Sequence, residues 1–204
     1  MRRTRTEDAR MFSIQALIER SKAAVCDPDP CEAVRTVLRG LLSNPSEVAA
    51  IFEDAGVPQG PDAPLAIDTL FDDQDLRIQR IAGPKGLVSA PHSHGRWAVI
   101  GVYAGQENNR VWKRQGDSIV IAESYDLVHP EILILPERTS IHSIANPGPG
   151  TSHAIHVYSG LEVDKWRMWH PETLEERQLE PDLFYKWCLE APQDYVVRHM
   201  HSAA

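Results

Sequence analysis

The chain has 204 residues, 42% of them hydrophobic and 25% charged, a composition that can fill the core of a globular domain. A formal net charge of −8 argues against a nucleic-acid-binding surface, and no apolar run approaches the roughly 18 residues that a membrane helix needs. The basic start lacks a following apolar segment, so we expect no secretory signal. Three cysteines without a C-x-x-C spacing fit a reducing compartment, and we expect a cytoplasmic protein.

Residues 8–56 predict helices. Apolar residues at 11–18 recur with the i, i+3, i+7 spacing of one helix face, and a similar stripe predicts a second helix at 31–42. An Asn-Pro pair at 44–45 predicts the start of a third helix, because it combines a capping residue with proline at the first helical position. Pro, Gly and Asp then dominate 57–66, which predicts a linker.

From residue 76 onward, short β-branched and aromatic runs alternate with turn residues and predict strands. The predicted strands are 76–82, 87–92, 97–104, 109–113, 117–123, 131–135, 140–146 and 152–158. Eight short strands predict a sandwich or barrel, and a helix is expected from Pro181 to Ala191. We therefore expect a mainly β fold with N-terminal helices: a helical extension packed on the barrel at 1–66, the barrel at 67–170, and a C-terminal helix and tail at 171–204.

Two histidines one residue apart, His92 and His94, are the strongest functional signal in the chain. On a strand both side chains point to the same face. A third, His142, follows a second apolar strand and a proline-marked turn. Three imidazoles can hold a metal ion and leave positions open for substrate or dioxygen. His199 and His201 have the same spacing, but we interpret that pair as part of a frayed tail.

The surroundings of these histidines resemble the two motifs of the cupin superfamily. Gly86, the histidine pair and Gly105 match the first motif, whose glutamate is missing here, and Pro136, His142 and Asn146 match the second without its glycines. A cupin with three histidines and no glutamate is similar to the cysteine dioxygenase type I-like thiol dioxygenase family. The resemblance implies a double-stranded β-helix, that is a jelly-roll barrel, in which the three histidines bind Fe(II). Zinc would accept the same ligands.

A third segment, from Ser152 to Tyr158, resembles the Ser-x-His-x-Tyr strand of thiol dioxygenases. The resemblance implies catalytic roles for Tyr158, whose phenol would face the metal, and for His156, which would orient that phenol. Ala154 stands where the family often has serine, so the full relay is broken. Because strand side chains alternate, Ala154 shares one face with these two residues, and His153 lies on the other.

An arginine is expected to bind the carboxylate of the substrate through two parallel hydrogen bonds. We assign this role to Arg80, because it alternates with the apolar Leu76 and Ile78 on a strand face that we expect to be internal. Arg77 and Arg96 are alternatives.

The resulting hypothesis is a non-haem iron thiol dioxygenase that oxidises a small carboxylated thiol, such as cysteine or 3-mercaptopropionate, to its sulfinate with dioxygen. Its expected partners are that thiol and dioxygen, with no nucleic acid and no membrane, and the helices could form a homodimer contact. Two alternatives stay open, because fold does not fix function. One is another metal-dependent cupin enzyme, either a non-thiol dioxygenase or an isomerase, and the other is a non-catalytic cupin that binds a small ligand.

Overall fold

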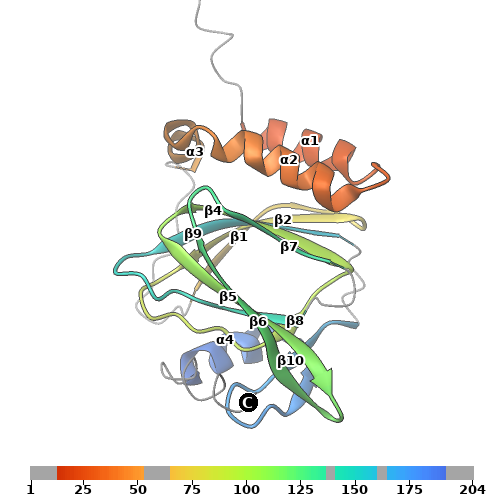
Figure 1. The fold of residues 1–204 in the computed structure, drawn as a ribbon, viewed down its shortest axis with the longest axis vertical. Coiled ribbons are helices and arrows are strands. Elements are labelled where there is room, and N and C mark those ends of the chain that lie inside the picture. The colour runs from red at the N-terminus through yellow and green to blue at the C-terminus, as the bar shows by residue number, and fades with distance from the viewer. Residues whose placement is uncertain (1–12, 53–64, 137–140, 160–164, 192–204) are drawn as a thin grey trace, which may run out of the picture.

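A computed structural model of the chain describes residues 13–52, 65–136, 141–159 and 165–191. These ranges form two antiparallel sheets with helices on both sides (Figure 1). The helices are α1 (Ile14–Ala24), α2 (Pro30–Leu42), α3 (Pro45–Phe52) and α4 (Pro181–Glu190). The strands are β1 (Ala66–Asp72), β2 (Leu76–Gly83), β3 (His92–Ser93), β4 (Trp97–Ala104), β5 (Gln106–Gln115), β6 (Ser118–Val128), β7 (Ile132–Leu135), β8 (Ile141–Ala145), β9 (Ser152–Ser159), β10 (Arg167–Trp169) and β11 (Glu176–Gln178).

The two sheets have the strand order of a jelly roll. One sheet has the order β1-β2-β9-β4-β7, and the other has the order β11-β10-β3-β8-β5-β6. From β2 to β9 the chain alternates between the sheets except at the β5–β6 hairpin, so early and late strands lie side by side. The expectation of a mainly β fold with N-terminal helices and a double-stranded β-helix is therefore confirmed.

The N-terminal helices cover the outer face of the β1-β2-β9-β4-β7 sheet (Figure 1). The Asp29 side chain caps α2 by accepting from the backbone N–H of Glu32, and Pro30 occupies the first turn. Buried apolar side chains from both layers form one core: Leu17, Val34, Leu38, Leu41, Val48 and Phe52 of the helices, with Leu76, Ile78, Trp97, Val99, Ile155 and Val157 of the strands. This sheet is consequently buried on both faces, unlike a sheet with one solvent-facing side.

Two further cores lie on the opposite side of this sheet. The first fills the space between the sheets with Ala98, Ile100, Val102, Val111, Leu127, Leu133, Leu135, Ala154 and Tyr158. The second forms where α4 packs against the barrel, and its members include Ile81, Leu87, Ala90, Met168, Phe184, Trp187 and Cys188. Helix α4 therefore covers the region just before His92, and the rings of Phe184 and His92 lie 4.9 Å apart.

The structure differs from the predicted elements at one strand that was predicted and at three that were not. The stretch predicted as a strand at 87–92 pairs only through a bridge between Val88 and Ala145 and through the short β3, because Pro91 has no N–H to donate. Strand β1, which was not predicted, begins at the last residue of the predicted linker and pairs with β2. Strands β10 and β11 were not predicted; they extend the second sheet beyond β3.

Most of the predicted linker and the tail with its second histidine pair lie outside the described residues, and the proposed division into three parts stays a prediction. Within the described ranges, none of the helices is long and apolar enough to cross a membrane.

Candidate metal centre

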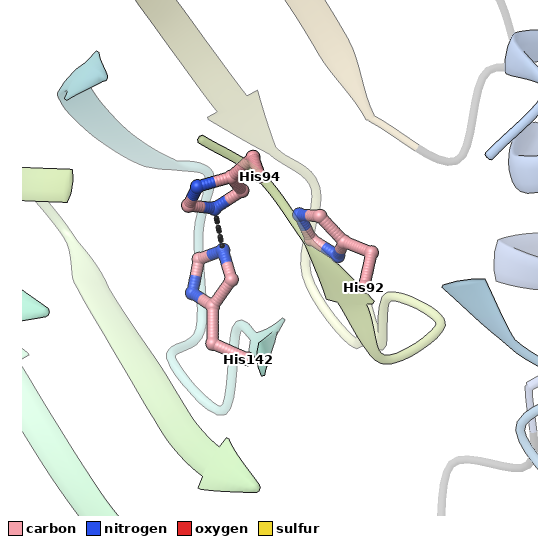
Figure 2. Close-up of side chains that lie close together, drawn as sticks. All are labelled: His92, His94 and His142. Carbon is pink, nitrogen blue, oxygen red and sulfur yellow. Dashed lines mark hydrogen bonds between the residues drawn. The ribbon is translucent and has the colours of Figure 1, made fainter. Parts of the chain in front are cut away.

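Strand pairing brings the three predicted histidines together. His92 on β3 lies directly opposite His142 on β8 in the antiparallel register, and His94 follows one residue after β3. Their potential ligand atoms all lie within 4.8 Å of one another, and the Nε2 atoms of His94 and His142 are 2.8 Å apart (Figure 2). These three histidines could hold a metal ion, and among the described residues no carboxylate belongs to the cluster.

Burial keeps these imidazoles neutral. Loss of solvent around His92 lowers its pKa to about 4. Burial also lowers the pKa of His94 and of His142 well below the usual value, and the neighbouring histidines lower both further. The neutral imidazole is the charge state that binds metals, so all three side chains have the required charge state at neutral pH.

Two of the three rings are oriented by hydrogen bonds behind them. Nδ1 of His92 lies 3.0 Å from the carbonyl oxygen of Ala90, and Nδ1 of His142 lies 3.0 Å from Oδ1 of Asn109. Both partners are oxygens that only accept, so each Nδ1 carries the hydrogen and each Nε2 keeps its lone pair for a metal. This arrangement fits a divalent metal held by three nitrogen donors, and it suits iron as well as zinc.

The Tyr158 and His156 side chains lie beside this cluster, on the face of β9 that points between the sheets. The phenol oxygen of Tyr158 is 2.9 Å from Nδ1 of His156, and its ring lies 4.3 Å from that of His94. Burial raises the pKa of Tyr158 above its usual value, and the carboxylate of Glu107 raises it further. The group next to the metal cluster is therefore a phenol rather than a phenolate. His153 lies on the opposite face of β9, as the alternation predicts, near the ring of Tyr103.

Two buried polar residues of β5, Glu107 and Asn109, belong to this site and were missed in the sequence. Oε1 of Glu107 accepts a hydrogen bond of 2.8 Å from Nδ2 of Asn109, and it also lies 3.4 Å from Nε2 of His156. The second separation is an ion-pair distance without hydrogen-bond geometry. The alternation along β5 could have identified both residues, because they lie two and four positions before the apolar Val111 and therefore share its inward face.

A cavity of about 330 Å³ opens onto the three histidines. Its polar wall includes Thr69, Arg77, Gln79, His156 and Tyr158. Its remaining wall is mostly apolar and aromatic: Leu65, Ile67, Ile81, Trp166, Leu179, Pro181, Phe184 and Tyr185. A concave, mostly apolar site with a few convergent polar groups is typical of small-molecule binding.

The position of Arg80 differs from the prediction. Its side chain is 2% exposed and is buried under the helices, where it lies 3.3 Å from Asp68 and donates to the carbonyl oxygen of Phe52 at 3.2 Å. The strand face is internal as expected, but it faces the helical layer rather than the cavity, and the anion that the arginine needs is Asp68. The structure therefore does not bring Arg80 to the histidines.

Arg77 lies on the cavity side of β2, opposite Tyr158 in the strand register. Its guanidinium is paired with both carboxylate oxygens of Asp72, at 3.1 and 2.9 Å, and lies 5.0 Å from the centre of the Trp166 ring. Arg96, the other alternative, is exposed and does not line the cavity. Of the three arginines considered, the geometry places Arg77 at the site.

Asn146, the last residue of the second motif, stabilises the loop that follows β8 through three side-chain hydrogen bonds. Its amide nitrogen donates to the carbonyl oxygens of Gly83 and Gly150, and its oxygen accepts from the N–H of Gly148. His129 contacts the carbonyl oxygen of Leu42 at 3.0 Å and is remote from the cavity.

Comparisons with known proteins find similarity among solved structures alone. No protein-family model and no curated protein sequence matches the chain. Similar solved structures include the cupin domain of Cnp3 from Schizosaccharomyces pombe, with 16% identity, a TM-score of 0.42, and coverage of 53% of this chain and 71% of that one. KdgF from a Halomonas species has 21% identity, a TM-score of 0.39, and coverage of 50% and 84%. A protein with a double-stranded β-helix domain from Klebsiella pneumoniae has 16% identity, a TM-score of 0.44, and coverage of 56% and 91%. At these scores, conclusions about this chain rest on its own strand order and side chains.

Proposed function

We propose that this protein is an iron-dependent thiol dioxygenase that converts a small carboxylated thiol and dioxygen to a sulfinate. The observation that carries the proposal is a cluster of three neutral histidines without a carboxylate, next to the hydrogen-bonded pair of Tyr158 and His156. In the proposed reaction R–SH and O₂ combine to give R–SO₂H. Sulfur is oxidised by four electrons and dioxygen is reduced by four, so no further co-substrate is needed.

The three histidines would hold the metal through their Nε2 atoms. Bound Fe(II) would supply the oxygen chemistry, which no protein side chain provides. Three neutral ligands leave the full positive charge of the ion uncompensated, which favours binding of a substrate as its thiolate. The protein therefore contributes ligand geometry, and a cavity whose apolar wall limits access of water.

Arg77 would bind the substrate carboxylate at the polar wall of the cavity. A guanidinium matches a carboxylate with two parallel hydrogen bonds, and here it already makes that pair with Asp72. The pair is partly exposed, with side-chain exposures of 18% for Arg77 and 45% for Asp72. A substrate carboxylate can therefore replace Asp72 at the guanidinium of Arg77, or share that guanidinium with Asp72, at little cost in free energy.

Tyr158 would contact the substrate or dioxygen through its phenol oxygen. The carboxylate of Glu107 beside Nε2 of His156 favours a hydrogen on that nitrogen, which leaves Nδ1 to accept the phenolic hydrogen. The phenol oxygen then offers its lone pairs to the cavity, where it can accept a hydrogen bond from an amino group of the substrate. This pair would orient the substrate beside His94.

The two other possibilities make different predictions. Another metal-dependent cupin enzyme would bind a metal in the same histidines but would not consume oxygen with thiols. A non-catalytic ligand-binding cupin would be stabilised by its ligand without turnover.

The test begins with anaerobic purification and metal analysis, followed by oxygen-electrode assays with Fe(II) and a panel of thiols including cysteine, 3-mercaptopropionate and mercaptosuccinate. About one iron per chain and oxygen uptake with one thiol would support the proposal. His92→Ala should lose iron and uptake together. His153→Ala is the matched control, because His153 lies on the outer face of β9 and does not line the cavity. Full uptake by His92→Ala, or iron without uptake for any thiol, would refute the proposal.

A further inference from the structure

Five side chains form one continuous line of polar contacts from the cavity to a metal-binding histidine. The line runs from the Tyr158 phenol to His156, from His156 to Glu107, from Glu107 to Asn109, and from Asn109 to His142. The separations are 2.9, 3.4, 2.8 and 3.0 Å, respectively. Glu107 lies at its centre, and it is 2% exposed.

The carboxylate at the centre sets the direction of the hydrogen bonds on one side. A carboxylate accepts only, so the end of the Asn109 amide that faces Glu107 is its NH₂ group. The amide oxygen of Asn109 then faces His142, and the Nδ1 of His142 carries the hydrogen. The Nε2 of His142 is left with its lone pair for a metal.

The same carboxylate acts on the other side through His156. The negative oxygen next to Nε2 of His156 favours a hydrogen there, and Nδ1 then accepts from Tyr158. One buried acid thus determines both the tautomer of a metal-binding histidine and the orientation of the cavity phenol.

We propose that Glu107 is a positioning residue shared by the metal centre and the Tyr158–His156 pair, and that it acts on the metal through Asn109. This inference rests on the proposed metal centre, and it is independent of which substrate the cavity takes. Removal of Glu107 allows the Asn109 amide to turn, so that its NH₂ group faces His142 and favours the tautomer with hydrogen on Nε2. In that tautomer Nε2, the atom that faces the metal site, has no lone pair for the metal.

The experiment compares Glu107→Ala, the isosteric Glu107→Gln and Asn109→Ala in the full-length chain. Two readouts are used: the affinity for Co(II), from its visible absorption, and the histidine tautomers of the metal-free protein, from ¹⁵N NMR shifts. Asn108→Ala is the matched control, because the amide of Asn108 points away from the site and donates to Ser124 and Asp126. Thermal melting shows which variants fold.

The expected result is a loss of about 10- to 100-fold in Co(II) affinity for Asn109→Ala and Glu107→Ala, the usual range for residues that orient a metal ligand. Glu107→Gln, whose amide can donate to Asn109 and allow it to turn, should lose affinity in the same direction while keeping the fold. Asn108→Ala should bind as the wild type does. In the Glu107 variants the resonance of the protonated Nδ1 of His142 should weaken as the Nε2–H form appears.

The inference is overturned if both Glu107 variants bind Co(II) like the wild type and keep hydrogen on Nδ1 of His142. Absence of Co(II) binding by the wild-type chain overturns the proposed metal centre instead, and the tautomers of the metal-free protein then decide the role of Glu107. If Glu107→Ala does not fold, Glu107→Gln gives the same two readouts.

Discussion

Replacing Arg77 with methionine should raise the KM for a carboxylated thiol far more than it lowers kcat. The substitution keeps most of the side-chain length over Trp166 but removes the guanidinium from the cavity wall. A hydrogen bond to a charged group contributes about 1.5–3 kcal/mol, and each 1.4 kcal/mol is a factor of ten, so KM should rise about 10- to 100-fold. The kcat should change less, because the carboxylate is bound equally before and during the chemical step.

Replacing Asp72, the partner of Arg77, should change KM in the opposite direction. Its partly exposed pair with Arg77 is worth at most about 1 kcal/mol. Asp72→Asn should therefore release the guanidinium and lower KM by up to about fivefold, since RT is about 0.6 kcal/mol.

Arg80→Met is the control that separates the two arginines. It leaves Asp68 without its partner under the helices, but Asp68 is 35% exposed, so the cost should be about 1–3 kcal/mol rather than that of a fully buried pair. Stability should fall and KM should not change. The assay is oxygen uptake against thiol concentration for 3-mercaptopropionate and for 2-mercaptoethanol, which lacks the carboxylate. A rise in KM for Arg80→Met but not for Arg77→Met, or an equal effect of Arg77→Met on both thiols, would refute the assignment.

Three other predictions concern the surroundings of the site. Tyr158→Phe should lower kcat about 100-fold without loss of iron, because it removes the phenol but keeps the ring beside the histidines, and equal kcat values would contradict its role. In the metal-free protein, the free energy of unfolding should fall as the pH drops from 6.5 toward 4, because His92 takes up a proton in the unfolded chain at a pH where it stays neutral in the folded chain. The part of this loss that comes from His92 is about 3 kcal/mol, and His94 and His142, whose pKa values burial also lowers, add to it. Urea titrations at pH 7 and pH 5 should show a smaller loss for His92→Asn than for the wild type. At pH 8 a thiol reagent should modify the exposed Cys26 quickly. Burial raises the pKa of Cys188 to about 12, so the reagent should modify Cys188 only after unfolding, and equal rates for the two cysteines would contradict this prediction.

The sequence alone determined the elements whose pattern has a simple period. Strand β4 has the predicted bounds, 97–104, because its run of β-branched and aromatic residues ends at a glycine turn. The helix predicted at 31–42 begins one residue earlier, at Pro30, where the cap and the proline agree. The shared face of His156 and Tyr158 follows from alternation on one strand, which needs no knowledge of the rest of the chain.

Only the tertiary structure decided which face of each strand meets the cavity. On β2 the alternation correctly places Arg77 and Arg80 on opposite faces, but it does not indicate which of them faces the cavity. The reason is that both faces of this sheet are covered, the outer one by helices and the inner one by the rest of the barrel. The apolar neighbours of Arg80 therefore indicated correctly that it is buried, but they did not indicate that its partner is Asp68 rather than a substrate carboxylate. Glu107 was missed for a related reason. A carboxylate at the start of a strand is usually exposed, and this one is buried in contact with Asn109 of the same strand and with His156 of a strand distant in the sequence. Short-range periodicity thus determines the faces, and long-range packing determines what each face contacts.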